Sequence, residues 1–408
     1  MKSDVFVHGS GVVREPLFVV LQNKILNKHK NTNNMNFIVS SSTLTSHLQA
    51  ISRVINSKNT IPVLDCFLFE IEGNILRLTA SDNDNTLNTS FEVVESSEDI
   101  RFAVSSKILL DSLKEISEQP LRFEVNKDNL EITIYYQNGK YSMVGMNADE
   151  YPSAPVMGEN AVKISIPSEV LSNGISCSLF AAADDEIRPV MCGIYFDFTP
   201  ESVTMVASDG HKLVRCRDLS VTGAEKSAFI LPKKPANLLK SLLARDGESE
   251  AVIEFDDRFA IFALANYRLV CRLIEGRYPN YNSVIPQNNP RKITIDRAAM
   301  ISALRRVAIF SSQVSLVKLH LQDNNMIISA QDTDFSTFAE ESLTCSYEGA
   351  PMNIGFSASF LIDILGNIPG REVVIELADP SRAGVMVPAE QVGQQELLML
   401  LMPMMLTE

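Results

Sequence analysis

The stretch Ala207-Ser208-Asp209-Gly210-His211-Lys212-Leu213 contains the marker that decides the fold. Its Ala-x-Asp, placed after an alternating strand pattern, occurs again as Ala80-Ser81-Asp82 and as Ala330-Gln331-Asp332. The spacing of roughly 125 residues is that of a whole domain, much longer than a solenoid repeat. The sequence therefore predicts three tandem copies of one domain.

The residues around each marker repeat as well. Upstream of each marker, apolar residues recur at helical spacing and predict an amphipathic helix. The three sets are Leu44, Leu48, Ile51 and Ile55; Leu171, Ile175 and Leu179; and Ile301, Leu304 and Ala308. Ser168 and Asp296 are the predicted N-caps of the second and third of these helices.

A second helix is predicted after each marker, at 106–116, 232–243 and 357–365. Alternating strands joined by polar turns surround both helices of each copy. Each copy is therefore predicted to be an α+β domain with two helices and antiparallel sheets, internally built from two similar halves.

Proline- and asparagine-rich connectors set the predicted boundaries. We expect a first domain at 35–155, a second at 156–288 and a third at 289–408. Residues 1–34 fall outside the repeat and end in a polar run, which predicts a disordered extension or an upstream start site.

Composition narrows the function. The net charge of −14 argues against a uniformly basic nucleic-acid binder, so any DNA contact must come from a local basic face. The six cysteines form no CxxC pair and the five histidines no ligand-spaced pair, so we expect reduced thiols, no metal and no cofactor. No apolar run is long enough to predict a membrane helix or a signal peptide.

Ser208, Asp209 and His211 suggest a catalytic triad at first sight. Side chains this close on extended backbone point apart, so a turn that closes a hairpin, with Gly210 at an unusual dihedral, is the simpler interpretation. The chain also has no P-loop and no nucleophile elbow. An enzyme is therefore disfavoured, and a β-rich scaffold or surface protein remains the other alternative.

Four segments, in this order and spacing, resemble one family, the β subunit of bacterial DNA polymerase III, the sliding clamp. They are Thr60-Ile61-Pro62-Val63-Leu64, the 207–213 stretch, Glu275-Gly276-Arg277-Tyr278-Pro279-Asn280-Tyr281 and the tail Leu401-Met402-Pro403-Met404. The resemblance implies a cytoplasmic, non-catalytic processivity factor. Two chains would pair head to tail into a ring, with a positive, helix-lined pore around double-stranded DNA.

The resemblance also implies a groove that captures short peptide motifs of the replicative polymerase, the clamp loader and repair proteins. Its residues here would be Met191, Ser208, Gly210, His211, Lys212, Leu213, Pro279, Val284, Ser357, Phe360, Leu400, Leu401, Met402, Pro403, Met404, Met405 and Leu406. Arginine is common in the family at Lys212 and Met405, and Asn and Tyr at Ser357 and Phe360. We therefore expect a more apolar groove. The tail alone would more simply be a final strand.

Other family sites carry over by position. DNA-facing cations would be Lys58, Lys107, Lys114, Arg188, Lys233 and Lys234, although charged helix faces are usually only solvated. The family often has an aromatic pair after Arg188, where this chain has Pro189-Val190, so we expect no base stacking there. The dimer interface would join Tyr141 and Met143 to Ile309 and Phe310, which could instead be core residues.

Overall fold

The computed structural model describes residues 34–153, 155, 157–158, 160–185, 187–247 and 249–406. The extension predicted at 1–34 lies outside these residues except for Asn34, which begins the first strand. The chain divides into two compact units, one of residues up to 154 and one from 155 onward. Each is described by itself.

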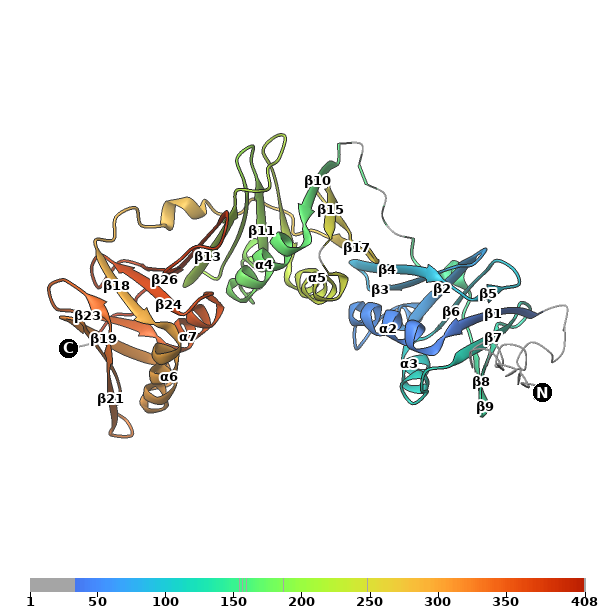
Figure 1. Ribbon diagram of the computed structural model, residues 1–408, viewed down its shortest axis with the longest axis horizontal. Helices are drawn as coiled ribbons and strands as arrows, with labels where there is room; N and C mark the ends of the chain where they lie inside the picture. The colour runs from blue at the N-terminus through green and yellow to red at the C-terminus, as the bar shows by residue number, and fades with distance from the viewer. Residues whose placement is uncertain are drawn as a thin grey trace, which may run out of the picture. The chain divides into compact units, whose positions relative to one another are not determined.

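The described residues of the first unit form two helices that lie against antiparallel sheets (Figure 1). Its helices are α2 (Ser41–Ile51) and α3 (Ser106–Lys114). Its strands are β1 (Asn34–Ser40), β2 (Cys66–Glu72), β3 (Ile75–Ser81), β4 (Asn85–Glu92), β5 (Glu95–Ser96), β6 (Ile100–Ser105), β7 (Pro120–Asn126), β8 (Glu131–Tyr136) and β9 (Gly139–Val144). The strand orders are β5-β1-β7-β8-β9 and β4-β3-β2-β6.

Helix α2 shows why the sequence folds this way. The hydroxyl of its N-cap Ser40 accepts the backbone N–H of Thr43, which satisfies a donor that the helix itself leaves unpaired. Leu44, Leu48 and Ile51 are buried, as their spacing predicts. Ile55 lies beyond the helix, after the short 3₁₀ turn Ser52–Val54, so that part of the helix prediction is wrong.

The second unit contains two further copies of the same architecture. Its helices are α4 (Ser168–Ser178), α5 (Lys233–Asp246), α6 (Arg297–Val307) and α7 (Ala358–Asn367). The strands of one copy are β10 (Val162–Pro167), β11 (Gly193–Phe198), β12 (Val203–Ser208), β13 (Lys212–Asp218), β14 (Ser227–Pro232), β15 (Glu250–Phe255), β16 (Phe259–Ala263) and β17 (Tyr267–Arg272). Those of the other are β18 (Arg291–Asp296), β19 (Leu316–Gln322), β20 (Asn325–Asp332), β21 (Thr337–Thr344), β22 (Ser346–Tyr347), β23 (Met352–Ser357), β24 (Glu372–Leu377), β25 (Gly384–Pro388) and β26 (Gln395–Leu401).

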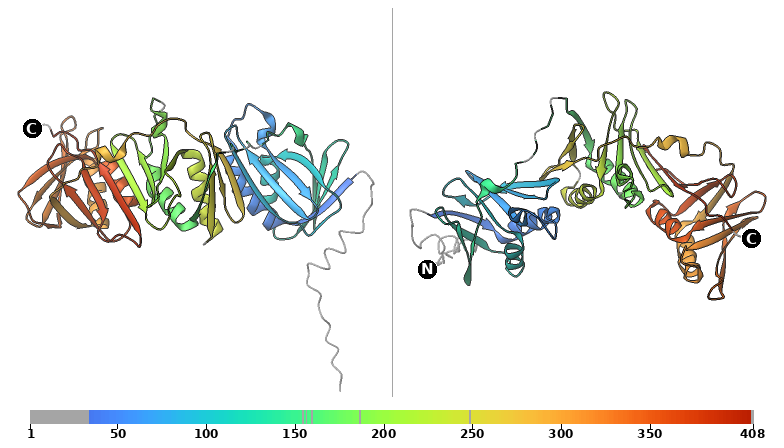
Figure 2. Two further views of the ribbon diagram at one scale, coloured as in Figure 1. Left: turned by 90° about the horizontal axis from the view of Figure 1, so that it is seen from above. Right: turned by 180° about the vertical axis from the view of Figure 1, so that it is seen from behind.

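One sheet runs through both copies of the second unit. Its order is β14-β11-β12-β13-β26-β25-β24-β18-β22, and the join is the antiparallel pair β13–β26. The remaining strands form β10-β15-β16-β17 and β21-β20-β19-β23. All four helices lie on one side of these sheets (Figure 2). The opposite, outer side of the nine-stranded sheet is covered near β13 by the connector that includes the 3₁₀ turn Tyr281–Val284.

The threefold repeat is confirmed at the level of single hydrogen bonds. In each copy, the strand that leads into the second helix forms a backbone hydrogen bond with the segment that follows the last strand of that copy. The bonded residue of the leading strand lies two positions before the helix N-cap. The pairs are Ala103 with Met146, Ile230 with Ile274, and Gly355 with Met404. The three markers lie at the C-terminal ends of β3, β12 and β20, which are equivalent strands.

Of the two predicted N-caps, one is confirmed and one is wrong. The Asp296 carboxylate accepts the N–H of Ala299 at 2.9 Å and caps α6. Ser168 is instead the first residue of α4, behind Pro167 at the N-cap, and its hydroxyl lies 3.1 Å from that of Ser249. Among the described residues no helix is long and apolar enough to cross a membrane.

Candidate functional site

The segment 208–212 is a tight turn between β12 and β13. Asp209 Oδ1 accepts the backbone N–H groups of His211 at 2.8 Å and Lys212 at 2.9 Å. The Ser208 hydroxyl donates to the carbonyl of Lys212 at 2.8 Å, and Gly210 adopts φ +91°. The predicted turn is therefore confirmed. The side chains of Ser208 and Asp209 hydrogen-bond to the backbone of the turn, and Gly210 supplies the positive φ that the turn needs.

Consecutive residues after the turn face opposite sides of the sheet. In the register of β13 and β26, Lys212 lies opposite Leu401 and Leu213 opposite Leu400. Leu213 and Leu400 join a cluster on the outer side, whereas Leu401 is buried in the core on the helix side. The residues predicted for the groove therefore divide between two faces, which meet where His211 and Met402 leave the sheet.

On the outer side the connector and the tail enclose a hollow of about 530 Å³. Val284 and Met402 line it, with 55% and 43% of their surfaces exposed. Tyr281 anchors the connector, because its hydroxyl donates to Asp197 Oδ2 at 3.0 Å. This hollow is accessible and has a mixed lining, and its apolar residues, among them Val284, Ile285 and Met402, suit the capture of a hydrophobic side chain.

On the helix side, the ring of Phe360 on α7 contacts the turn 208–212. Lys212 Nζ lies 4.3 Å from the ring centroid of Phe360, and the His211 ring stacks on Phe360 at 5.9 Å. Lys212 Nζ also donates to Asp209 Oδ2 at 2.5 Å, and both side chains are largely buried. Burial raises the pKa of Asp209, but hydrogen bonds from Lys212 and from the backbone N–H of His211 outweigh it and hold the pKa below its ordinary value.

The tail crosses from the second copy of the repeat to the third. The N–H of Met402 donates to the carbonyl of His211 at 2.8 Å, and the N–H of Met404 donates to the carbonyl of Gly355 at 2.8 Å. A Cβ at Gly355 would lie 2.7 Å from the carbonyl oxygen of Met404, so glycine lets the tail lie this close. Met405 is 83% exposed, so the end of the tail offers apolar surface.

The predicted groove residues differ widely in exposure. Those with exposed surface are Gly210, His211, Pro279, Val284, Met402 and Met405. Half-buried are Phe360, Pro403, Met404 and Leu406. Buried are Met191, Ser208, Lys212, Leu213, Ser357, Leu400 and Leu401. A residue such as Leu401, with no exposed surface, can shape a groove only from beneath.

Sequence reasoning missed several neighbours of this site. Ile285 and Ser381 line the outer hollow, and Asp209 holds Lys212. Arg382 and Ala383 also line it, within the edge at 382–384 that the sequence had left open because of a one-residue gap. An aspartate three residues before a lysine across a glycine turn was a usable signal for that ion pair. The approach of Ser381 to the connector has no local signal, because it depends on the fold of the third copy.

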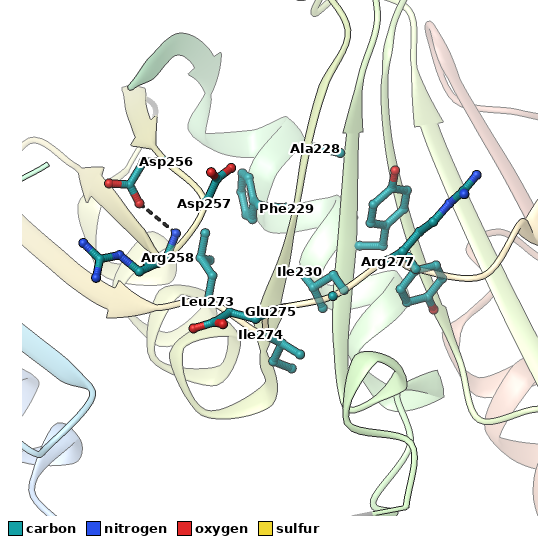
Figure 3. Close-up of a pocket in the computed structure, with 13 residues that line it drawn as sticks. Ala228, Phe229, Ile230, Asp256, Asp257, Arg258, Leu273, Ile274, Glu275 and Arg277 are labelled. Atoms are coloured by element: carbon teal, nitrogen blue, oxygen red, sulfur yellow. Dashed lines mark hydrogen bonds between the residues drawn. The ribbon is translucent and has the colours of Figure 1, made fainter. Parts of the chain in front are cut away.

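A second hollow of about 490 Å³ lies elsewhere in the second unit, between β14 and the β15–β16 turn (Figure 3). Phe229 and Leu273 lie within it, and Asp257, Glu275 and Arg277 lie around it. Its lining carries both signs of charge and contains none of the predicted groove residues.

The predicted DNA-facing cations are mostly on helices. Lys107 and Lys114 are exposed on α3, and Lys233 and Lys234 begin α5. Lys58 lies on a loop beyond α2, so its placement on a helix is wrong.

Some of these cations already have partners. Lys233 Nζ donates to Asp184 Oδ1 at 2.6 Å, and Lys114 Nζ to Asp111 Oδ1 at 3.0 Å. Arg188 pairs with Asp185 at 3.2 Å and donates to the carbonyl of Asp209. Exposed pairs of this kind are weak and can exchange for a phosphate.

The four predicted interface residues lie at sheet edges or beside one. Tyr141 and Met143 are half-buried on β9, the outermost strand of its sheet. Ile309 and Phe310 follow α6 and are 78% and 39% exposed, so a core position is excluded for them. Edge strands and exposed large apolar side chains are features of association surfaces.

Within the part of the chain that the structure describes, no group of three or more His, Cys, Asp or Glu side chains could hold a metal ion. The six cysteines are free thiols, and burial raises the pKa of Cys66 to about 11 and of Cys216 to about 12. Such thiols are poor nucleophiles at neutral pH.

Comparison with known proteins gives a consistent match along the chain. Three family models match in order: the N-terminal domain of the DNA polymerase III beta subunit at 35–155, its central domain at 165–280 and its C-terminal domain at 282–405. A beta sliding clamp from Synechocystis is 28% identical, over 91% of this chain and 100% of the relative. One from Haemophilus influenzae is 27% identical, over 85% and 93%. A crystal structure of a sliding clamp from Bartonella birtlesii bound to griselimycin has 25% identity, a TM-score of 0.84, and coverage of 91% and 100%.

Proposed function

The chain belongs to the family of the DNA polymerase III β subunit, and from this we propose which of its surfaces do the work of a sliding clamp. It is a non-catalytic processivity factor that encircles duplex DNA and tethers polymerase there. One observation carries this conclusion: three copies of one fold are matched, in order, by the three domains of the family. The scaffold and enzyme alternatives explain neither that order nor the coverage.

The direct test is topological. Fluorescent protein is loaded by a clamp loader onto a nicked circular duplex, and its retention on DNA is followed after removal of the loader. We expect long retention on the circle and rapid loss once a restriction enzyme linearises it. The matched control is the same linear DNA with protein blocks at both ends, which should restore retention. Equal loss from circular and unblocked linear DNA would contradict an encircling ring.

For partner binding we propose the groove formed by the turn 208–212, the connector and the tail. Its support is the accessible hollow beside the apolar side chains of Val284 and Met402, with the exposed Met405 at the tail. Flexible methionines adapt to different side chains, which suits a site that serves several partners. The bound motif would be a short peptide with apolar anchors, such as Gln followed by Leu and Phe.

For DNA we propose contacts to phosphates by Lys58, Lys107, Lys114, Arg188, Lys233 and Lys234. Phosphate contacts carry no sequence information, which a protein that slides requires. The net charge of −14 is compatible with this, because the proposal needs only a local group of cations.

For ring closure we propose a head-to-tail homodimer, in which Tyr141 and Met143 of one protomer pack against Ile309 and Phe310 of the other. Strands β9 and β21 are both outermost in their sheets, so each offers unpaired backbone groups. Lys140 is exposed on β9 and Glu340 on β21, which favours pairing of the two edges with each other over pairing of like edges.

Two further assignments complete the proposal. The domains would span 35–155, 156–288 and 289–408, which assigns residues 1–34 to none of the three. The protein would act in the cytoplasm, where replication takes place and where free thiols such as those of its six cysteines stay reduced.

A further inference from the structure

One aromatic ring joins the third copy of the repeat to the second. Phe360 is in the first turn of α7, and its ring contacts two residues of the 208–212 turn. The Lys212 ammonium is 4.3 Å from the ring centroid, and the His211 ring stacks at 5.9 Å with 25° between the planes. Phe360 is only half-buried, so part of its ring remains accessible.

The cation at this contact is withdrawn from water. The Lys212 side chain is 7% exposed, and Asp209 Oδ2 accepts its Nζ at 2.5 Å. A desolvated cation over an aromatic face attracts it more strongly than an exposed one. The lysine is fixed by the turn, because Asp209 Oδ1 also accepts the backbone N–H of Lys212.

Lys212 has no route to a peptide lying in the outer hollow. Side chains alternate along β13, so Lys212 faces the helices with Val214 and Cys216, whereas Leu213 faces the outer cluster. Any influence of Lys212 on peptide binding must therefore pass through a neighbour, and Phe360 is a neighbour on another copy of the repeat that keeps accessible surface.

We propose that Lys212 is a positioning residue for the peptide groove: its ammonium holds the Phe360 ring, and with it the start of α7, at the separation from the turn that admits a peptide side chain. This rests on the proposed groove and adds a specificity element to it. Groove width would then be set by a charged contact between two copies of the repeat.

Removing the lysine alone would leave Asp209 buried without its partner, so the charges are removed in two steps. In Asp209→Asn the ammonium still faces the ring, which makes this variant the matched control. In Asp209→Asn with Lys212→Met the cation is gone while the chain length is nearly kept. Adding Phe360→Leu to both variants removes the ring and completes a double-mutant cycle.

The probe is a fluorescein-labelled peptide containing Gln followed by Leu and Phe, titrated into full-length protein by fluorescence polarisation. We expect Lys212→Met to weaken binding about tenfold in the Asp209→Asn background, and less than about twofold when Phe360→Leu is present. Lys212→Arg in the wild-type background should keep the affinity within about threefold, since it retains the cation. NMR of the lysine ε-methylene protons should show an upfield ring-current shift for Lys212 that disappears in Phe360→Leu.

The outcomes separate this inference from the groove itself. If the peptide does not bind the wild-type protein, the groove is wrong and the inference falls with it. If the peptide binds but Lys212→Met has no effect, or has the same effect with and without Phe360, the positioning role is wrong while the groove stands. Thermal unfolding of each variant confirms that the compared proteins are folded.

Discussion

Leu213 of β13 lies directly opposite Leu400 of β26, and both side chains are buried on the outer side of the nine-stranded sheet. These residues belong to the second and third copies of the repeat, so the two copies share one continuous sheet. Their neighbours Lys212 and Leu401 are paired in the same register but face the helices. The groove proposed for partner peptides thus lies where one sheet continues from the second copy into the third.

The exposed apolar pair after α6 predicts a separation of folding from association. Ile309→Ala with Phe310→Ala should leave the melting temperature of the chain nearly unchanged, because both side chains are exposed within it. Truncating large apolar groups in a packed contact costs on the order of 2–5 kcal/mol each, so the dimer should dissociate to a folded monomer. Sedimentation velocity checks the mass, and circular dichroism checks the fold.

The matched control is Ile187→Ala with Val392→Ala, which truncates two other exposed apolar side chains, 88% and 65% exposed. This control should remain dimeric. A monomeric control, or an Ile309/Phe310 variant that stays dimeric, would place the interface elsewhere.

The repeat was predictable because it shows in local patterns: the Ala-x-Asp markers, the helical periodicity and the turn residues all recur. It was harder to predict which residues share a face. Alternation along β13 could have separated Lys212 from Leu213, but the pairing of Leu213 with Leu400 links distant segments and has no local signal. The contact of Lys212 with Phe360 depends on the same long-range pairing.

The cap of α6 predicts a pH dependence of stability. Hydrogen bonds from the backbone of Ala299 and from Arg371 lower the pKa of Asp296, so its carboxylate contributes stability above the unfolded pKa of about 3.9. That contribution is lost as pH falls through the lower, folded pKa. Asp296→Asn keeps a capping oxygen without the charge. Urea unfolding should therefore show the wild type more stable at pH 7 and the two proteins converging as pH falls below 4.

Asp323→Asn, at an exposed turn position between β19 and β20, is the control and should follow the wild type at every pH. A constant gap between wild type and Asp296→Asn from pH 7 to pH 3 would show that the carboxylate charge adds nothing to the cap.

The start of α5 predicts a change in salt dependence. Lys233→Glu with Lys234→Glu should weaken equilibrium binding to a short duplex. The negative slope of the logarithm of the association constant K against log salt should become shallower by about 0.9 for each phosphate that the variant no longer neutralises. The ion pair of Lys233 with Asp184 does not prevent this, since an exposed partner is readily exchanged. Fluorescence polarisation at several salt concentrations gives the slope.

Because that variant also changes the net charge, its control must change it equally. Lys163→Glu with Lys226→Glu alters two exposed lysines on β10 and on the loop before β14, away from the helices. The control should lower affinity slightly and leave the slope intact. If the two variants have equal slopes, the start of α5 does not contact DNA.

The tail predicts a loss of partner binding without loss of the ring. Deleting 404–408 removes the hydrogen bond from Met404 to Gly355 and the exposed Met405, but leaves β26, which ends at Leu401. The strand pairing that joins the two copies is therefore retained, and the protein should stay dimeric. Apolar anchors carry most of the binding energy in such grooves, so peptide affinity should fall at least tenfold, about 1.4 kcal/mol, and polymerase stimulation should be lost.

Deleting only 407–408 is the control and should change neither peptide affinity nor polymerase stimulation. If the protein lacking 404–408 binds a polymerase-derived peptide as tightly as the full chain in a fluorescence-polarisation titration, the groove is misplaced and the tail is only an outer strand.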